Sequence, residues 1–493
     1  MKKLKHMKKN ITLIFILLLQ VISTGQDLSS LNKLVDKYQK SKLFKNSTWA
    51  LHARYLKSGK VILDKNSEVS VAPASNMKLF TSTAALEILG EDYKFSTKLY
   101  YDGSISDDGN LYGNIYIVGG GDPSLGYDLV KSALPLDELM QSWIKAISAK
   151  GIKTVRGNII ADALLYDAKP IPDMWDWIDI GNYYGASSTA LTINNNLYFL
   201  YFKPGNKGEA AEVLRMEPEV PGLTFTNYMK TGAKGSGDNG YIYCAPLQYN
   251  ATLRGTIPAG VDEFSIKGSI PDPPLFAAQK LMSALQENGI AVKGKPTKLI
   301  NLVIYDDSKM ITKTISPPLK DIVYIVNKRS DNLYTEMLLK ALALNVKGKG
   351  DIESGTEAVK EYLERNGINS DGLFMYDGCG LSRSDAITAK MMVDLLEMLT
   401  KKKHFDSFFN SLAVVGDPGD IGYFSSMGRG TEIEKNAHIK SGVITGVRAY
   451  SGYLKDRKGK TIIFSLIANN YNGEGSDVSF VHKKIMIELA KLN

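Results

Sequence analysis

Residues 72–89, APASNMKLFTSTAALEIL, change from a loop-like start to an apolar helix, and they contain the first pair of candidate site residues. The segment starts with small residues around Pro73 and continues as an apolar helix that we expect to end at Gly90. Ser75 lies in the first turn and Lys78 follows three residues later, so the two side chains share one face of the helix. The pair is either a nucleophile with its base or a helix cap followed by an unrelated lysine.

The first interpretation has a definite physical requirement. A serine hydroxyl is a good nucleophile only when a base lies within hydrogen-bond reach, and a lysine can be that base if burial lowers its pKa toward neutrality. The apolar neighbours of Lys78 indicate such burial. The Ser-x-x-Lys spacing alone is weak, because it recurs at Ser30 and Ser142. Only Ser75 begins an apolar helix, where backbone N–H groups favour a developing negative charge.

A second polar motif is KRSDN at residues 328–332. Ser330 and Asn332 precede a predicted helix, and two residues of such a loop can both face a cleft. The same residues also suit a plain helix N-cap.

A third motif, Lys-Ser-Gly, begins a predicted strand at Lys440. Ser441 adds a hydroxyl, and Gly442 has no side chain, so a substrate backbone can lie alongside this strand. Lys-[Ser/Thr]-Gly also occurs at Lys57 and Lys230, but there it falls in turns or loops. The prediction of a functional site therefore rests on the order and placement of all three motifs and not on any one of them.

Ser-x-x-Lys, Ser-x-Asn and Lys-Ser-Gly in this order resemble the penicillin-recognising serine acyl-transferases, which include class A β-lactamases and D-alanyl-D-alanine peptidases. About 255 residues separate Ser75 from Ser330. Such an insertion is similar to the D-alanyl-D-alanine carboxypeptidase/endopeptidases of the penicillin-binding protein 4 type. Further sequence segments fit this resemblance: YIVGGGDPSL, GNIIADALLY, YDGCGLSRSDAITAKMMVDLL and KSGVITGVRAYSGYL. Two residues depart from the family pattern, Cys379 and Ser441, which stand where the family usually has serine and threonine.

This resemblance implies a serine-type D-Ala-D-Ala carboxypeptidase/endopeptidase that acts on peptidoglycan stem peptides, is acylated by penicillin and needs no cofactor. The implied catalytic residues are Ser75, Lys78, Ser330, Asn332 and Lys440. The implied substrate-binding residues are Ser441, Gly442, Val443, Asp162 and Arg383, with the backbone N–H of Val443 in the oxyanion hole and the last two at a rim that reads the substrate side chain.

Two alternatives remain open from the sequence. A β-lactamase uses the same reacting groups but deacylates with a glutamate in a separate Glu-x-x-x-Asn loop. Between the second and third motifs that spacing occurs only at Glu432 and Asn436, immediately before the Lys440 strand. The other alternative is a non-catalytic peptidoglycan-binding protein, against which the intact motifs argue.

The expected fold class is α+β, with a transpeptidase/β-lactamase-like domain of helices on an antiparallel sheet. A β-rich insert of one or two small domains interrupts it. We expect a signal peptide over residues 1–26, the first part of the transpeptidase-like domain over 27–97, the insert over 98–267 and the second part over 268–493.

The composition and net charge of the chain limit the functions that it can have. The chain has 493 residues and a formal net charge of +8, but five of its lysines lie among residues 2–9. That lysine-rich head and the apolar run after it predict a secretory signal peptide, and hence an exported, periplasmic protein, with association with the membrane as an alternative left open. The remaining charge of about +3 gives no case for nucleic acid. No cluster of the five histidines and two cysteines has metal-site spacing.

Overall fold

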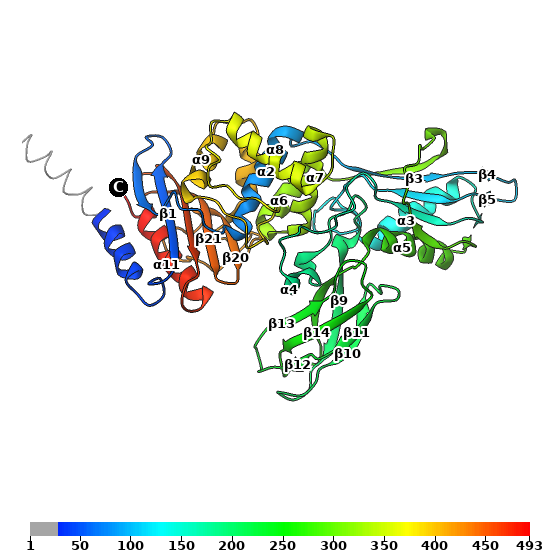
Figure 1. Ribbon diagram of the computed structural model, residues 1–493, viewed down its shortest axis with the longest axis horizontal. Coiled ribbons are helices and arrows are strands. Elements are labelled where there is room, and N and C mark those ends of the chain that lie inside the picture. Colours follow the sequence, from blue (N-terminus) through cyan, green and yellow to red (C-terminus); the bar gives the residue numbers. More distant parts are fainter. Residues whose placement is uncertain (1–27) are drawn as a thin grey trace, which may run out of the picture.

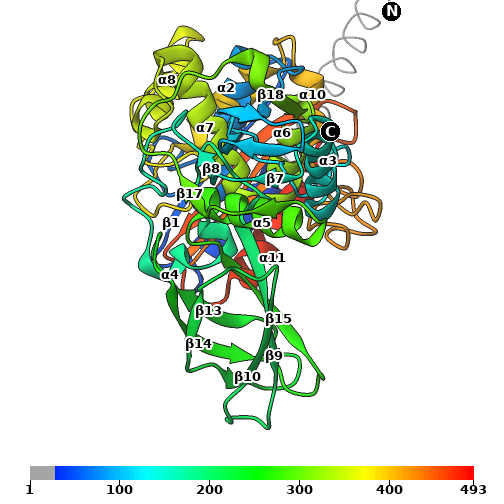
Figure 2. The ribbon, with the colours of Figure 1, turned by 90° about the vertical axis from the view of Figure 1, so that its right-hand side faces the viewer.

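The computed structural model describes residues 28–493, and the predicted signal peptide lies outside them. Figure 1 shows three parts: a body built from both ends of the chain, an arm extending from it, and a lower lobe beside the arm. We define the body as residues 28–95 and 316–493, the arm as 96–162 and 273–315, and the lower lobe as 197–269. The view in Figure 2 shows the lower lobe projecting away from both other parts.

A six-stranded sheet, ordered β19-β20-β21-β22-β1-β2 and antiparallel throughout, forms the centre of the body. Its first two strands in the chain, β1 and β2, pair as an antiparallel hairpin. The strands are β1 (Thr48–Tyr55), β2 (Val61–Lys65), β19 (Ala413–Val414), β20 (His438–Ile444), β21 (Val447–Lys455) and β22 (Thr461–Asn469).

Both faces of this sheet are covered, and the side-chain alternation of β22 shows it. Ile463 and Ile467 face a core shared with the helices between the sheet and the arm, whereas Phe464 and Leu466 face the core under α11 (Gly475–Ala490). Two buried faces explain why apolar residues occupy both sides of β22, on either side of the buried Ser465. The helices on the first face are α2 (Lys78–Leu89), α6 (Leu319–Arg329), α7 (Asn332–Lys347), α8 (Ile352–Arg365), α9 (Ala389–Leu399) and α10 (Phe405–Ser411).

The arm contains a five-stranded sheet, β17-β8-β6-β3-β18, and a four-stranded sheet, β16-β7-β5-β4. Helices α3 (Leu136–Ala149) and α5 (Pro273–Glu287) supply its apolar cover. The strands are β3 (Ser96–Tyr101), β4 (Ser104–Ile105), β5 (Asn110–Tyr112), β6 (Ile115–Val118), β7 (Thr154–Val155), β8 (Ile159–Asp162), β16 (Ala291–Val292), β17 (Pro296–Lys298) and β18 (Met310–Ile315).

The prediction ended the insert at residue 267, but the arm also contains residues 273–315. The chain after the lower lobe does not return directly to the body, because β17 pairs with β8 and β18 pairs with β3. Helix α5 also belongs here, since Phe276 and Leu281 pack into the arm's core. The sequence of α5 has a helical period, but a period does not specify which surface the apolar face covers.

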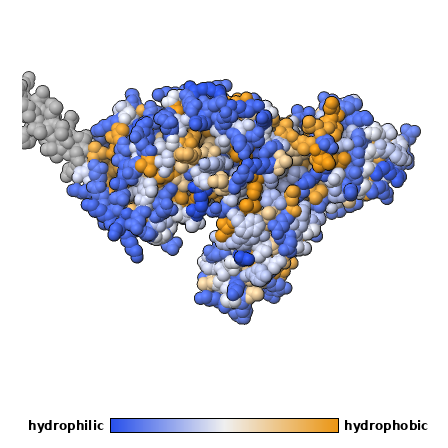
Figure 3. Space-filling view, in the orientation of Figure 1, coloured by the Kyte–Doolittle hydropathy of each residue, from blue (hydrophilic) through white to orange (hydrophobic). Residues whose placement is uncertain are grey.

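The lower lobe consists of two small sheets, β10-β9-β15 and β11-β14-β12, with β13 paired to β14. Its strands are β9 (Leu197–Lys203), β10 (Glu212–Glu217), β11 (Thr224–Asn227), β12 (Lys230–Thr231), β13 (Asn239–Tyr243), β14 (Asn250–Ile257) and β15 (Phe264–Ser269). Figure 3 shows an indentation of the surface between this lobe and the body. No helix within residues 28–493 is long and apolar enough to cross a membrane.

A buried lysine of the body holds the connecting segment, residues 163–196, which joins the arm to the lower lobe. Lys340 on α7 is fully buried, and its Nζ donates to Asp167 Oδ1 at 2.8 Å, to the Lys169 carbonyl at 2.8 Å and to the Ser188 carbonyl at 3.0 Å. All three acceptors belong to the connecting segment, so this one ammonium fixes the segment against the body.

Replacing Lys340 by alanine is expected to lower the free energy of unfolding by about 3 kcal/mol, because it leaves a partly buried carboxylate and two carbonyls without their donor. Urea denaturation followed by tryptophan fluorescence measures this. Lys320→Ala is the matched control, since its partner Asp92 is 78% exposed and such pairs contribute less than about 1 kcal/mol. Equal losses in the two variants contradict the assignment.

Candidate active site

The short helix η1 (Ala74–Met77) and the first turn of α2 bring Ser75 and Lys78 together. Lys78 Nζ lies 3.0 Å from Ser75 Oγ, 2.6 Å from Asn332 Oδ1 and 2.8 Å from the Cys379 carbonyl oxygen. The three acceptors satisfy the three donors of an ammonium, although the Lys78 side chain is fully buried. The predicted pair is therefore a hydrogen-bonded contact, which a serine used only as a helix cap does not require.

Burial lowers the pKa of Lys78, and the negative charges of Asp377 and Glu336 partly oppose this effect. Desolvation disfavours the ammonium because a buried amine is shielded from the solvent that would stabilise its charge. A lysine in this position releases its proton more readily than an exposed one. The free amine beside Ser75 Oγ can then accept the hydroxyl proton.

The second motif lies at the sharp junction of α6 and α7. Ser330 has a left-handed backbone with φ of 59°, and Asp331 caps α7 by accepting from the Tyr334 backbone N–H at 2.9 Å. This turn directs Ser330 Oγ toward Lys440, whose Nζ donates to it at 2.9 Å. Burial, together with repulsion from Lys78, holds the pKa of Lys440 well below its usual range.

The third motif lies on β20, which packs directly against η1. A Cβ at Gly442 would stand 2.3 Å from the Pro73 carbonyl oxygen and 3.2 Å from Ala74 Cβ, so only glycine allows this approach. The next residue, Val443, is half exposed beside Ser75 in the same cavity. Gly442 therefore allows β20 to lie close to η1, which carries Ser75.

A loop at residues 377–382 supplies the carbonyl that receives Lys78. Glu336, one turn after Asn332 on α7, accepts the Gly378 backbone N–H with both carboxylate oxygens, at 2.9 and 3.1 Å. From α2, Thr81 Oγ1 donates to the Gly378 carbonyl at 2.7 Å. The loop is therefore held from both helices, which fixes the direction of the Cys379 carbonyl.

Within residues 28–493, one group brings three possible metal-ligand side chains close together: Glu336, Asp377 and Cys379. Its two carboxylates already accept backbone N–H groups from the 377–382 loop, and Asp377 also accepts from Trp175 Nε1. Burial raises the pKa of the Cys379 thiol well above its usual range, which disfavours the thiolate that binds metals. We assign this group to holding the loop.

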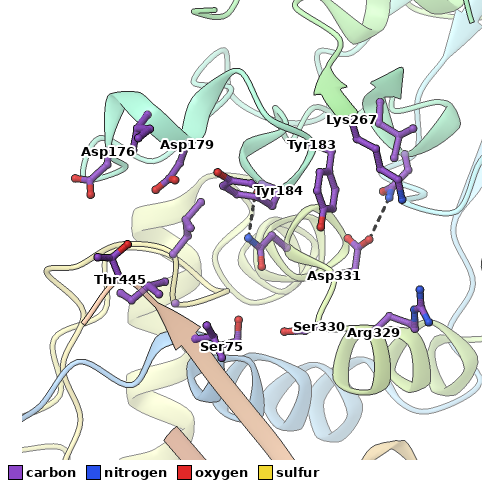
Figure 4. A pocket seen from close by; sticks show the side chains of 18 of the residues that line it. Ser75, Asp176, Asp179, Tyr183, Tyr184, Lys267, Arg329, Ser330, Asp331 and Thr445 are labelled. Carbon is purple, nitrogen blue, oxygen red and sulfur yellow. Dashed lines mark hydrogen bonds between the residues drawn. The ribbon is translucent and has the colours of Figure 1, made fainter. Parts of the chain in front are cut away.

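A cavity of about 490 Å³ opens above these residues, with Ser75 and Ser330 side by side at its base (Figure 4). Of the predicted site residues, those that line it are Ser75, Ser330, Asn332, Val443 and Arg383. Lys78 and Lys440 are buried behind it and reach it through the two serines. Ser441 and Gly442 lie on β20 but are not among the lining residues.

Asp162, predicted at the rim, lies outside the lining of this cavity. Its carboxylate accepts from Tyr305 Oη at 2.7 Å and from the Leu164 backbone N–H at 2.9 Å within the arm. The aspartate terminates β8 and caps the turn that follows, which is an ordinary structural role at the end of a strand.

The other rim prediction, Arg383, does reach the cavity. Its Nε lies 3.0 Å from Asp176 Oδ2, and its Nη2 donates to the Thr445 carbonyl at 2.9 Å. Asp176 and Thr445 also line the cavity, as does Asp179. Asp176, Asp179 and Thr445 lie at one end of the cavity (Figure 4), and the contacts of Arg383 with Asp176 and Thr445 place it there too.

The connecting segment and lower lobe supply residues that the motifs did not reveal. Asn332 Nδ2 donates to the Tyr184 carbonyl at 2.8 Å, which leaves Oδ1 to face Lys78. Asn195 Nδ2 donates to the second oxygen of Asp331 at 3.1 Å. One sequence signal could have found part of this network, because Asn332, Glu336 and Lys340 recur every four residues on an otherwise apolar helix.

With this geometry, the chain can be compared with known proteins. Residues 31–492 match the D-Ala-D-Ala carboxypeptidase 3 (S13) family. The D-alanyl-D-alanine carboxypeptidase of Actinomadura sp. (strain R39) is 31% identical over 426 residues, which are 84% of this chain and 76% of that protein. The D-alanyl-D-alanine carboxypeptidase DacB of Haemophilus influenzae is 26% identical over 443 residues, which are 87% of each chain.

Solved structures agree on the fold. The crystal structure of penicillin binding protein 4 from Haemophilus influenzae matches with a TM-score of 0.79 at 24% identity, covering 94% of this chain and 99% of that one. A structure of the same protein complexed with a β-lactam matches with a TM-score of 0.74 at 22% identity, covering 95% and 99%. This likeness confirms the predicted α+β class with inserted domains.

The pH dependence of acylation tests whether the charge of Glu336 acts on Lys78. Burial, reinforced by Asp377, raises the pKa of Glu336 to about 8, so its negative charge grows as the pH rises through that value and increasingly stabilises the Lys78 ammonium. Glu336→Gln removes this charge, which lowers the pKa of Lys78. The rate of acylation by a labelled penicillin, measured from pH 6 to 10, should reach its plateau at lower pH in the variant.

The exposed Glu353→Gln is the matched control and should leave the pH profile unchanged. A profile of Glu336→Gln that moves to higher pH, or does not move, contradicts this influence of Glu336 on Lys78.

Proposed function

The chain belongs to the D-Ala-D-Ala carboxypeptidase 3 (S13) family, and on that premise we propose that it is a serine DD-peptidase with Ser75 as its nucleophile. It acts on peptidoglycan stem peptides ending in D-Ala-D-Ala and forms an acyl-enzyme with penicillin. One observation carries the proposal: the Lys78 amine, buried and 3.0 Å from Ser75 Oγ, is held by an amide and a carbonyl from two other segments.

Acylation begins when Lys78 accepts the hydroxyl proton as Ser75 Oγ attacks the carbonyl carbon of the penultimate D-alanine. The backbone N–H groups of Ser75 and Val443 receive the oxyanion, and the close packing at Gly442 supports this assignment because it brings β20 next to η1. Loss of one such donor typically costs about 3 kcal/mol of transition-state stabilisation.

The bond to the leaving D-alanine then breaks. Ser330 delivers a proton to the departing amine, and the 2.9 Å contact with Lys440 allows that lysine to replace the proton. Lys440 attracts the terminal carboxylate, and Ser441 binds it. Asn332 binds the substrate amide as well as Lys78. Water next hydrolyses the ester on Ser75.

The cavity disfavours the β-lactamase alternative. Rapid deacylation in such enzymes uses a glutamate, but no glutamate is among the residues that line this cavity within the described chain. Glu432 instead pairs with Arg457 at 3.0 Å, and Asn436 bonds the Lys455 backbone. A slowly hydrolysed penicillin ester follows from this arrangement.

The end of the cavity around Arg383 suits the side chain of the acyl donor. Asp179 lines it, and burial, with repulsion from Asp176, raises the pKa of its carboxyl group. A cationic amine favours the ionised form of this carboxyl group, and Arg383 suits a carboxylate. A stem-peptide residue whose side chain ends in both groups is the substrate that these charges fit. Asp179 thus replaces Asp162 in the predicted role.

A cell-wall substrate places the protein outside the cytoplasm, and we assign it to the periplasm. The lysine-rich, apolar N-terminus supports export. A non-catalytic peptidoglycan-binding role is disfavoured, because a protein that only binds has no use for two buried lysines paired with serines.

Ser75→Ala should abolish covalent labelling by penicillin, because no hydroxyl remains to form the ester. Intact-mass spectrometry after incubation with benzylpenicillin measures this, with one adduct expected on the wild type. Ser142→Ala, at the mid-helix Ser-x-x-Lys spacing, is the matched control and should label fully. An unlabelled wild type, or an undiminished adduct on Ser75→Ala, rejects the proposal.

A further inference from the structure

The cavity has two chemically different ends, one on each side of Ser75 (Figure 4). Asp176, Asp179 and Thr445 lie toward one end. Ser330 lies on the other side of Ser75, and beyond it are Arg329 and Lys267. Under the proposed mechanism Ser330 faces the departing amine, so the second end receives the leaving group.

Lys267 has no carboxylate partner within the described residues. It projects from β15 of the lower lobe, and its Nζ lies over the rings of Tyr183 at 5.3 Å and Phe199 at 5.2 Å. Partial burial, together with the positive charge of Arg329, lowers the pKa of Lys267. An anion at this position would favour the charged lysine.

Arg329 is also without an acidic partner among residues 28–493. It ends α6, its Nη1 donates to the Ile421 carbonyl at 3.1 Å, and its guanidinium lies 4.9 Å from the ring centre of Tyr423. These contacts orient the side chain and leave its other donors available. Two cations from different parts of the fold thus face one cavity.

The acid that lines this end, Asp331, partly offsets the lowering of the Lys267 pKa through its charge but forms no direct ion pair with either cation. Its carboxylate oxygens accept from the Tyr334 backbone N–H and from Asn195 Nδ2. Both oxygens therefore serve the cap of α7 and its contact with the connecting segment. This end of the cavity is cationic, with tyrosines on its walls.

We propose that Lys267 and Arg329 form a subsite for a free carboxylate on a leaving group larger than D-alanine, namely the second stem peptide of a peptidoglycan cross-link. This rests on the proposed function. D-alanine has one carboxylate, which Lys440 and Ser441 already receive. In a cross-link, the D-alanine carbonyl is bonded to the side-chain amine of a diamino acid whose peptide carries further carboxylates.

The chemistry is that of the same acyl transfer with a different amine. Ser75 Oγ bonds to the D-alanine carbonyl carbon, the C–N bond of the cross-link breaks, and the diamino acid leaves as an amine with the proton from Ser330. Water then hydrolyses the Ser75 ester. Lys267 and Arg329 take no proton in this sequence and serve only to hold the departing strand, which gives the enzyme an endopeptidase preference.

The test compares two substrates in each variant: a cross-linked peptide dimer and a single pentapeptide ending in D-Ala-D-Ala. Lys267→Ala and Arg329→Ala should each lower the ratio of kcat/KM for the dimer to kcat/KM for the pentapeptide about tenfold, as expected for a lost hydrogen bond to a charged group. Lys267→Arg should largely keep the ratio. Lys313→Ala, an exposed lysine of the arm, is the matched control and should not change it.

A dimer that keeps the carboxylate next to the scissile bond, but has the other carboxylates of the departing stem peptide converted to carboxamides, provides the complementary arm. The wild type should lose its preference for this dimer, and the two alanine variants should treat it as the wild type does. Equal losses on dimer and pentapeptide overturn the subsite, because the cations then serve the terminal carboxylate. An unchanged ratio in both variants overturns it too.

These outcomes are distinct from failure of the proposed function. If penicillin still acylates Ser75 and the pentapeptide is cleaved while the ratio is unchanged, only the subsite is rejected. If the wild type neither forms the penicillin adduct nor cleaves the pentapeptide, the proposed function is rejected and the subsite with it.

Discussion

The buried ammonium of Lys78 is the constraint on which the rest of the site depends. An unpaired buried charge costs several kcal/mol, so each of its donors requires an acceptor. Ser75 Oγ, Asn332 Oδ1 and the Cys379 carbonyl provide them. Because these acceptors belong to η1, α7 and the 377–382 loop, the lysine is satisfied only when three distant segments meet. The arrangement that solves this electrostatic problem also places an amine of lowered pKa beside a hydroxyl.

Helix α7 connects that lysine to the inserted parts of the chain. Asn332, Glu336 and Lys340 share one buried face, and they contact Lys78, the 377–382 loop and the connecting segment respectively. The connecting segment in turn receives the Asn332 amide through the Tyr184 carbonyl. The insertion therefore orients a side chain of the proposed catalytic site, in addition to forming walls of the cavity.

The structure brings the three motifs together around one cavity, whereas it divides the chain differently from the predicted partition. The three motifs located Ser75 and Lys440 because each needs a particular residue type on a particular element. Asp162 was misplaced because the end of a strand does not reveal which neighbour the side chain will meet, here Tyr305. Helix α5 was assigned to the wrong part because periodicity reveals an apolar face but not its partner. The cations at the leaving-group end come from separate elements and follow no motif.

The central claim is that Ser75, Lys78 and Val443 form one acylation site. A crystal structure of the wild-type protein soaked with benzylpenicillin tests it most directly. Our account predicts an ester on Ser75 Oγ, with its carbonyl oxygen within hydrogen-bond distance of the backbone N–H groups of Ser75 and Val443. An adduct on another residue, or a carbonyl oxygen directed away from both N–H groups, would contradict it.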